Sequence, residues 1–330
     1  MMRSAGHYDE AAGQLYPARE PFARQMLDVG DGHTLYLEQS GNPDGVPVIV
    51  LHGGPGGGSS PYMRRFFDPE HYRIVLFDQR GCGRSAPYAT LERNTTAHLI
   101  EDLRRIRATL GITRAVLFGG SWGATLALAA AQADPGAVLG LVLRGVFLGR
   151  REELDWFYGG GAARFWPDAW AAFIAPIPED ERSDLIGAYH RRLTCGDHIA
   201  EARIAQSWAA WENRLATLDG PGAGQIAPDY ARCFARLESH YFANGCFLDE
   251  GQILRDMPRI SHLPGVIVQG RYDMVCPPSA AHDLAAAWPR ASLRLLPASG
   301  HAMSEPRIAR ELARAMDEAR STWAQAGSPD

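Results

Sequence analysis

Gly119-Gly120-Ser121-Trp122-Gly123 is the stretch that decides the fold, because it fits the pattern G-x-S-x-G between two segments of opposite character. Residues 115–118 before it are apolar and predict a buried strand. Residues 124–131 after it are rich in Ala and Leu and predict a helix. So sharp a turn excludes bulky neighbours, which explains the glycines. The pattern predicts an exposed serine on strained backbone, with the positive end of a helix pointing at it.

Two further strand-like runs each lead into a polar residue that can work with Ser121. Residues 265–269 precede Asp273, and residues 292–296 precede His301. The chain order serine, acid, histidine matches that of a catalytic triad built around such a turn. Serine is a weak nucleophile until a base takes its proton, so His301 is the expected base and Asp273 its orienting acid. Taken singly, Asp273 could be a helix cap and His301 a surface histidine, but their joint order favours the triad.

A glycine-rich loop at residues 52–58 follows the apolar strand predicted at 48–51. Such a loop commonly supplies one N–H group to an oxyanion, and the residue after the nucleophile supplies the other. These two donors are expected to be Gly54 and Trp122. A phosphate-binding loop is the rival interpretation, but the pattern G-x-x-x-x-G-K-[ST] is absent and the chain contains no lysine.

The composition is that of an ordinary globular protein, with 330 residues, 46% of them hydrophobic, and a formal net charge of -5. This charge attracts neither nucleic acid nor an anionic membrane. No signal peptide and no run of 18 apolar residues is evident. The five cysteines are scattered without C-x-x-C pairs, which argues against disulfides and zinc. We therefore expect a cytoplasmic protein without metal or cofactor, whose oligomeric state is left open.

Strands alternate with helices in the first part of the chain, which predicts an α/β fold with a mostly parallel sheet and helices on both faces. The remaining expected elements are a hairpin at 25–39 with its turn at 30–32, a strand at 73–77, a helix at 95–110 ended by Gly111, a strand at 140–144 and a closing amphipathic helix at 307–324.

The alternation stops near residue 147 and resumes near 264. Between these points the chain carries five of its eight tryptophans, in helical patterns interrupted by Pro and Gly. The sequence therefore predicts core residues at 1–147, an inserted helical cap at 148–263 over the catalytic residues, and a second part of the core at 264–330.

Several motifs together resemble proline iminopeptidase, an α/β-hydrolase family that removes N-terminal proline from peptides. They are His52-Gly53-Gly54-Pro55-Gly56, Asp78-Gln79-Arg80-Gly81-Cys82-Gly83-Arg84-Ser85, the Ser121 turn, Leu143-Arg144-Gly145-Val146-Phe147, Trp211-Glu212, Arg236-Leu237-Glu238-Ser239-His240-Tyr241-Phe242 and Gly270-Arg271-Tyr272-Asp273. The likeness runs from about residue 16 to residue 315. It implies an α/β-hydrolase fold and a serine exopeptidase that works through an acyl-enzyme.

The resemblance also implies how a peptide would be recognised. Glu212 and Glu238 match the two glutamates that grip the free α-amine of the substrate, and charge-assisted hydrogen bonds of this kind are strong. A proline inside a peptide has no free amine and would leave both carboxylates unpaired. The resulting loss of binding free energy selects against internal peptides. The positions that would surround the proline ring are Phe147, Phe157, Phe242 and Cys276.

Other functions share part of this pattern. An esterase, a lactonase or a broader aminopeptidase of the same fold would keep the triad and lack the amine site. A non-catalytic ligand receptor would not need all three triad members. Dehalogenases and epoxide hydrolases carry Asp at the turn, so Ser121 disfavours them. The sequence leaves open the peptide length, the acceptance of hydroxyproline or alanine, and any thiol sensitivity through Cys276.

Overall fold

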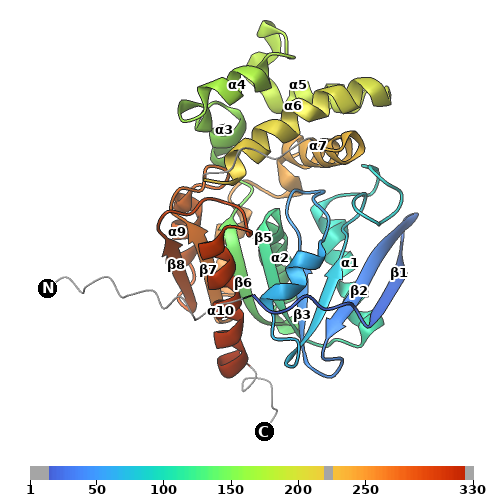
Figure 1. Ribbon diagram of the computed structural model, residues 1–330, viewed down its shortest axis with the longest axis vertical. Helices are drawn as coiled ribbons and strands as arrows, with labels where there is room; N and C mark the ends of the chain where they lie inside the picture. Colours follow the sequence, from blue (N-terminus) through green and yellow to red (C-terminus); the bar gives the residue numbers. More distant parts are fainter. Residues whose placement is uncertain (1–14, 219–225, 324–330) are drawn as a thin grey trace, which may run out of the picture.

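An eight-stranded sheet lies at the centre of the protein (Figure 1). The computed structural model describes residues 15–218 and 226–323. The strand order is β1-β2-β4-β3-β5-β6-β7-β8; β2 runs antiparallel to β1 and β4, and the other neighbours are parallel. The strands are β1 (Ala23–Gly30), β2 (His33–Gly41), β3 (Val46–Leu51), β4 (Tyr72–Phe77), β5 (Ala115–Ser121), β6 (Val138–Val146), β7 (Gly265–Gly270) and β8 (Ala291–Leu296). This mostly parallel sheet confirms the expected fold class.

The central strands are buried on both faces, because helices cover each side of the sheet. In β3, Ile49 and Leu51 belong to one apolar cluster and Val48 and Val50 to the other, as the alternation of a strand requires. The first cluster includes α1, α2 and α9, and the second includes α10. These helices are α1 (Thr96–Leu110), α2 (Trp122–Ala133), α9 (Pro278–Ala286) and α10 (Pro306–Trp323).

A layer of helices connects β6 to β7. It consists of α3 (Arg151–Tyr158), α4 (Pro167–Ile174), α5 (Leu185–Leu193), α6 (His198–Ala216), α7 (Pro228–Ala243) and the short α8 (Gln252–Arg255). Helices α3 to α7 stack at the top of Figure 1, beyond the end of the sheet. Aromatic residues form the interior of this layer: Phe173 stacks on Tyr189 at 4.7 Å between ring centroids, and Tyr158 stacks on Trp208 at 4.4 Å.

The elements expected from the sequence agree with those observed to within a few residues. Helix α1 ends where predicted because Gly111 adopts the left-handed conformation, with φ 66°. Residues 1–14 of the N-terminal segment and residue 324 of the closing helix lie outside the described residues. None of the described helices combines the length and apolar character needed to cross a membrane. The division into core and cap stays a prediction.

Candidate active site

Ser121 occupies the turn between β5 and α2, with φ 57° and ψ -127°. Two close approaches make this turn possible. A Cβ atom on Gly119 would lie 2.2 Å from the carbonyl oxygen of Gly123, and one on Gly123 would lie 2.1 Å from that of Leu51. The glycines are therefore required by the packing of backbone on backbone, as the sequence predicted.

Asp273 and His301 form a buried pair. The Asp273 Oδ2 atom lies 2.8 Å from Nδ1 of His301, and the Asp273 side chain is fully buried. Its Oδ1 atom accepts hydrogen bonds from the backbone N–H groups of Val275 and Cys276, and Gln269 Nε2 donates to Oδ2 at 3.1 Å. These partners fix the carboxylate. Burial lowers the pKa of His301, which favours the neutral imidazole that a general base requires.

Ser121 and Cys276 line the same pocket, and burial raises the pKa of the Cys276 thiol well above its ordinary value. Within the described part of the chain, no hydrogen bond joins Ser121 to His301. Catalytic hydrogen bonds are often long in the absence of substrate and tighten when it binds. The expected contact between nucleophile and base therefore stays a prediction.

The glycine-rich loop lies against the Ser121 turn. A Cβ atom on Gly53 would be 3.3 Å from Cβ of Ser121. Gln79 joins the two segments that carry the expected oxyanion donors: its Nε2 donates to the His52 carbonyl oxygen at 2.9 Å, and its Oε1 accepts from Trp122 Nε1 at 3.0 Å. The loop and the start of α2 are thus held together by one buried amide.

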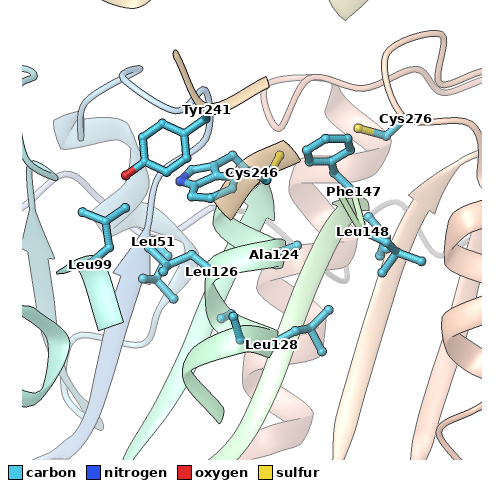
Figure 2. Packing of buried hydrophobic residues seen from close by; sticks show 14 of the residues in the cluster. Leu51, Leu99, Ala124, Leu126, Leu128, Phe147, Leu148, Tyr241, Cys246 and Cys276 are labelled. Atoms are coloured by element: carbon cyan, nitrogen blue, oxygen red, sulfur yellow. The ribbon is translucent and has the colours of Figure 1, made fainter. Parts of the chain in front are cut away.

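A narrow pocket of about 10 Å³ lies beside Ser121. It brings together the nucleophile, one expected oxyanion donor and all six residues expected to bind substrate, and it adds three more. Its lining is Gly54, Ser121, Phe147, Glu153, Leu154, Phe157, Glu212, Glu238, Phe242, Val275 and Cys276. Phe147 and Cys276 stand side by side above the strand ends in Figure 2.

Two carboxyl groups face this pocket from the helical layer, Glu212 from α6 and Glu238 from α7. Each of the two carboxyl groups affects the pKa of the other, and Glu238 Oε2 accepts a hydrogen bond from Trp208 Nε1 at 2.7 Å. The Oε2 atom of Glu212 is shielded from solvent and has no hydrogen-bond partner. Burial raises the pKa of Glu212 to about 7 and that of Glu238 well above its ordinary value. Burial therefore favours the protonated form of both carboxyl groups.

Aromatic rings form the apolar wall of the pocket. Phe147 and Phe242 meet edge to face, with ring centroids 5.7 Å apart. Phe157 packs between Tyr158 and Trp211, at 4.3 and 6.5 Å. These contacts with the helical layer fix the shape of the wall before any ligand binds.

Glu153 lines the pocket but was not foreseen from the sequence. It lies in the first turn of α3, and its Oε2 atom accepts the backbone N–H groups of Leu148 and Arg150, each at 3.0 Å. Burial raises its pKa to about 7. Acidic residues are ordinary at helix N-termini, so nothing in the sequence distinguished this one. Within the described ranges, no group of three or more His, Cys, Asp or Glu side chains is arranged to hold a metal ion.

Comparisons with known proteins agree with this geometry. Residues 46–307 match the family model described as alpha/beta hydrolase fold. The chain is 55% identical to a proline iminopeptidase of Xylella fastidiosa, over 88% of this chain and 95% of that protein. It is 53% identical to the proline iminopeptidase of Xanthomonas citri, over 92% and 98%. The crystal structure of a proline iminopeptidase-related protein from Thermus thermophilus is 26% identical, with a TM-score of 0.58, over 91% and 99%. The chain belongs to the proline iminopeptidase family of α/β hydrolases.

Proposed function

We propose that this protein is a serine exopeptidase that releases N-terminal proline from peptides. The observation that carries the proposal is that Ser121 and the buried pair Glu212 and Glu238 open on the same pocket. The first is a nucleophile on a strained turn, and the second is a site for a cation. Named relatives that share about half of the sequence support the same activity.

The carboxyl pair selects the chain end. The unpartnered Oε2 atom of Glu212 is satisfied when a protonated prolyl amine donates to it. An internal or acylated proline brings no cation and leaves the buried carboxylates unpaired, which is costly. Helices α6 and α7 carry the pair. Residues 148–263 therefore act as a cap that fixes the spacing between the bound amine and Ser121.

The chemistry is acyl transfer in two steps. Ser121 Oγ attacks the prolyl carbonyl carbon while His301 takes its proton, and the N–H groups of Gly54 and Trp122 stabilise the oxyanion. The C–N bond then breaks, and His301 gives the proton to the departing peptide amine. Water attacks the acyl-enzyme with His301 again as base, and proline leaves with Ser121 restored. Asp273 stabilises the imidazolium form in both steps.

The apolar wall provides the selectivity for proline. A pyrrolidine ring fits between aromatic side chains without needing polar partners, whereas a charged or long side chain would be desolvated without compensation. The residues of this slot are Phe147, Phe157, Phe242 and Cys276. The five cysteines are free in the structure, which supports the further proposal that the protein works in a reducing cytoplasm on small peptides.

Hydrolysis of proline arylamide and of its N-acetylated form tests the proposal. The free amine is expected to be cut, and the blocked substrate is expected to be resistant. Ser121→Ala should remove the activity and keep the fold, as measured by circular dichroism. Equal cleavage of both substrates would exclude the carboxyl pair as amine site and favour a general serine hydrolase. Turnover by the Ser121→Ala variant would exclude the nucleophile.

A further inference from the structure

The loop that carries His301 is attached to the end of α6, which lies 85 residues earlier in the chain. The Ala216 carbonyl oxygen accepts the backbone N–H groups of His301 at 3.2 Å and Ala302 at 2.8 Å. From the other side, Arg144 donates to the His301 carbonyl oxygen at 2.8 Å. Position 216 is about one helical turn after Glu212. The last residue of α6, the helix that carries Glu212, is therefore hydrogen-bonded to the backbone of His301.

Glu305 strengthens this junction. Its Oε2 atom accepts the N–H group of Gly300 at 2.7 Å, and its Oε1 atom accepts that of Leu218 at 2.9 Å. One carboxylate therefore bridges the residue before His301 and the segment that follows α6. A Cβ atom on Gly300 would lie only 2.8 Å from Glu305 Oε1, so the bridge depends on glycine at that position.

The charged groups that act on His301 are Asp273, Arg144 and Glu305. Burial lowers the pKa of His301, and the charge of Arg144 lowers it further. The negative charges of Asp273 and Glu305 act in the opposite direction and raise it. Glu305 therefore acts on the base in two ways, through the backbone that it holds and through its charge.

We propose that Glu305 is a positioning residue for the reaction, because its carboxylate fastens the His301 loop to the C-terminal end of the helix that carries Glu212. The proposal rests on the proposed role of His301 as general base. It does not require that the substrate be proline. Glu305 is not among the residues that line the pocket beside Ser121, so its effect on the reaction is expected to pass through His301.

Glu305→Gln is the variant that tests this role. A side-chain amide keeps one acceptor oxygen and turns its NH₂ group toward a backbone N–H group, so one of the two bridges is lost. On proline arylamide we expect kcat to fall about tenfold, since small misplacements of catalytic groups are costly. KM should stay within about twofold, because the amine site is unchanged. The acidic limb of the kcat/KM profile should move to lower pH, because a negative charge near His301 is gone.

Asp197→Asn is the matched control. Asp197 also accepts two backbone N–H groups, those of Ile199 and Ala200, but at the opposite end of α6. This variant should leave kcat, KM and the pH profile as in the wild type. Gly300→Ala displaces the Glu305 carboxylate without removing its charge, so it should lower kcat with a smaller change in the acidic limb.

Labelling of Ser121 by a fluorophosphonate separates this inference from the proposed function, because it needs the base but not a prolyl amine. Glu305→Gln should slow the labelling by a factor similar to its effect on kcat. If the wild type labels but does not cleave proline arylamide, the proposed function fails and the labelling still tests Glu305. Wild-type labelling and kcat in a folded Glu305→Gln variant would overturn the inference, and so would a change confined to KM.

Discussion

The backbone of Ser121 is strained at a position where the proposed reaction requires a side chain. Its φ of 57° and ψ of -127° lie in a region that side chains rarely adopt, yet the nucleophile must carry a side chain there. Strain of this kind costs on the order of 1–3 kcal/mol and persists where the surrounding structure enforces it. Here β5, α2 and the approach of Gly123 to Leu51 enforce it.

Glycine at position 121 should relieve this strain. We expect Ser121→Gly to be more stable than Ser121→Ala by about 1 kcal/mol, although both variants are inactive. Thermal or urea unfolding of the two variants measures the difference. Equal stability, or a less stable glycine variant, would show that the turn is not strained.

The carboxyl group of Glu212 links function to stability. Its pKa is raised to about 7 because the group is buried, whereas a Glu in an unfolded chain titrates near 4.5. The folded state therefore binds the proton more tightly. This contribution to stability is fully present below about pH 4.5 and is lost as the pH rises through about 7.

Glu212→Gln should remove two properties together. One is the loss of stability that accompanies ionisation of the buried Glu212 carboxyl group at high pH, and the other is the enzymatic activity. We expect the variant to be more stable than the wild type at pH 8, with a smaller difference at pH 5, in thermal unfolding. Its kcat/KM on proline arylamide should fall ten- to hundredfold or more, since a charge-assisted hydrogen bond contributes about 1.5–3 kcal/mol. Glu152→Gln, at a side chain with 68% exposure in α3, is the control and should change neither property. A wild-type pH dependence of stability in Glu212→Gln would contradict the assignment.

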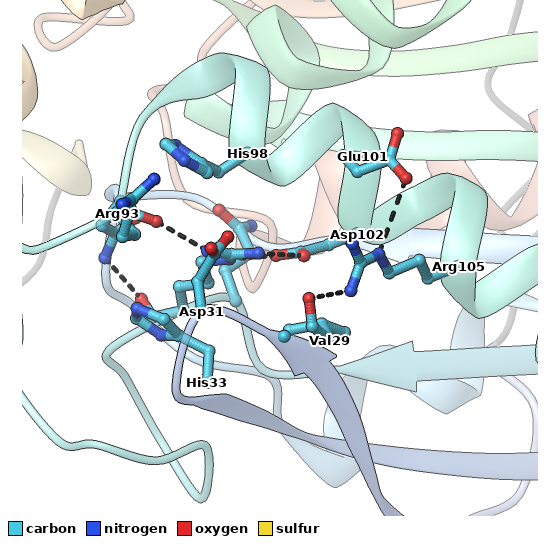
Figure 3. Close-up of polar contacts among 12 residues, drawn as sticks. Val29, Asp31, His33, Arg93, His98, Glu101, Asp102 and Arg105 are labelled. Atoms are coloured by element: carbon cyan, nitrogen blue, oxygen red, sulfur yellow. Dashed lines mark hydrogen bonds and ion pairs between the residues drawn. The ribbon is translucent and has the colours of Figure 1, made fainter.

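At the scale of elements, a buried ion pair joins α1 to the loop at residues 78–85. Arg80 donates two hydrogen bonds to Asp102, each of 2.7 Å, and a third at 2.7 Å to the Arg93 carbonyl oxygen. Asp102, Asp31 and Arg93 lie together in Figure 3. Because Gln79 precedes Arg80, this ion pair also supports the Gln79 amide, which is hydrogen-bonded to both His52 and Trp122.

Asp102→Asn should destabilise the protein by about 3 kcal/mol, because it leaves the buried guanidinium of Arg80 with only the partly exposed Asp31, 3.5 Å away, as a counter-charge. Urea unfolding measures the decrease in the free energy of unfolding. The exposed pair Arg151 and Asp155 offers a control, and Asp155→Asn should cost well under about 1 kcal/mol. If both variants lose a similar, small amount of unfolding free energy, the buried pair does not stabilise the junction between α1 and the loop.

At the scale of the whole molecule, one apolar cluster runs without interruption from the sheet into the helical layer. It contains Ile49 and Leu117 of the sheet together with Trp208 and Trp211 of α6. The layer therefore shares its core with the strands below it. This continuity joins the helix that carries Glu212 to the strands that precede Ser121.

We expect the sheet and the helical layer to unfold together. Five of the eight tryptophans lie in residues 148–263, so their fluorescence reports mainly on that layer. Far-ultraviolet circular dichroism reports on the whole chain. The two signals should give coincident urea transitions. An earlier transition in fluorescence would mean that the layer folds as an independent unit.

The sequence predicted the eight strands and, to within a few residues, the helices α1, α2 and α10, because these follow from interactions among neighbouring residues. Strand burial, glycine turns and helix ends leave periodic signals within about ten residues. The Ser121 turn is such a case, since its glycines and its flanking runs are contiguous. The assignment of Glu212 and Glu238 needed a family resemblance, because a glutamate in a helix is usually solvated.

The sequence by itself determined the kind of sheet and the position of the Ser121 turn, and it predicted the chain order of nucleophile, acid and base. Only the tertiary structure decided that Glu212 and Glu238 are buried with raised pKa values, that Glu153 lines the same pocket, and that Glu305 bridges to Leu218. The physical reason is that burial and hydrogen bonding of these carboxylates depend on groups far away in the chain. A local pattern specifies the backbone, whereas the charge state of a buried group is set by everything packed around it.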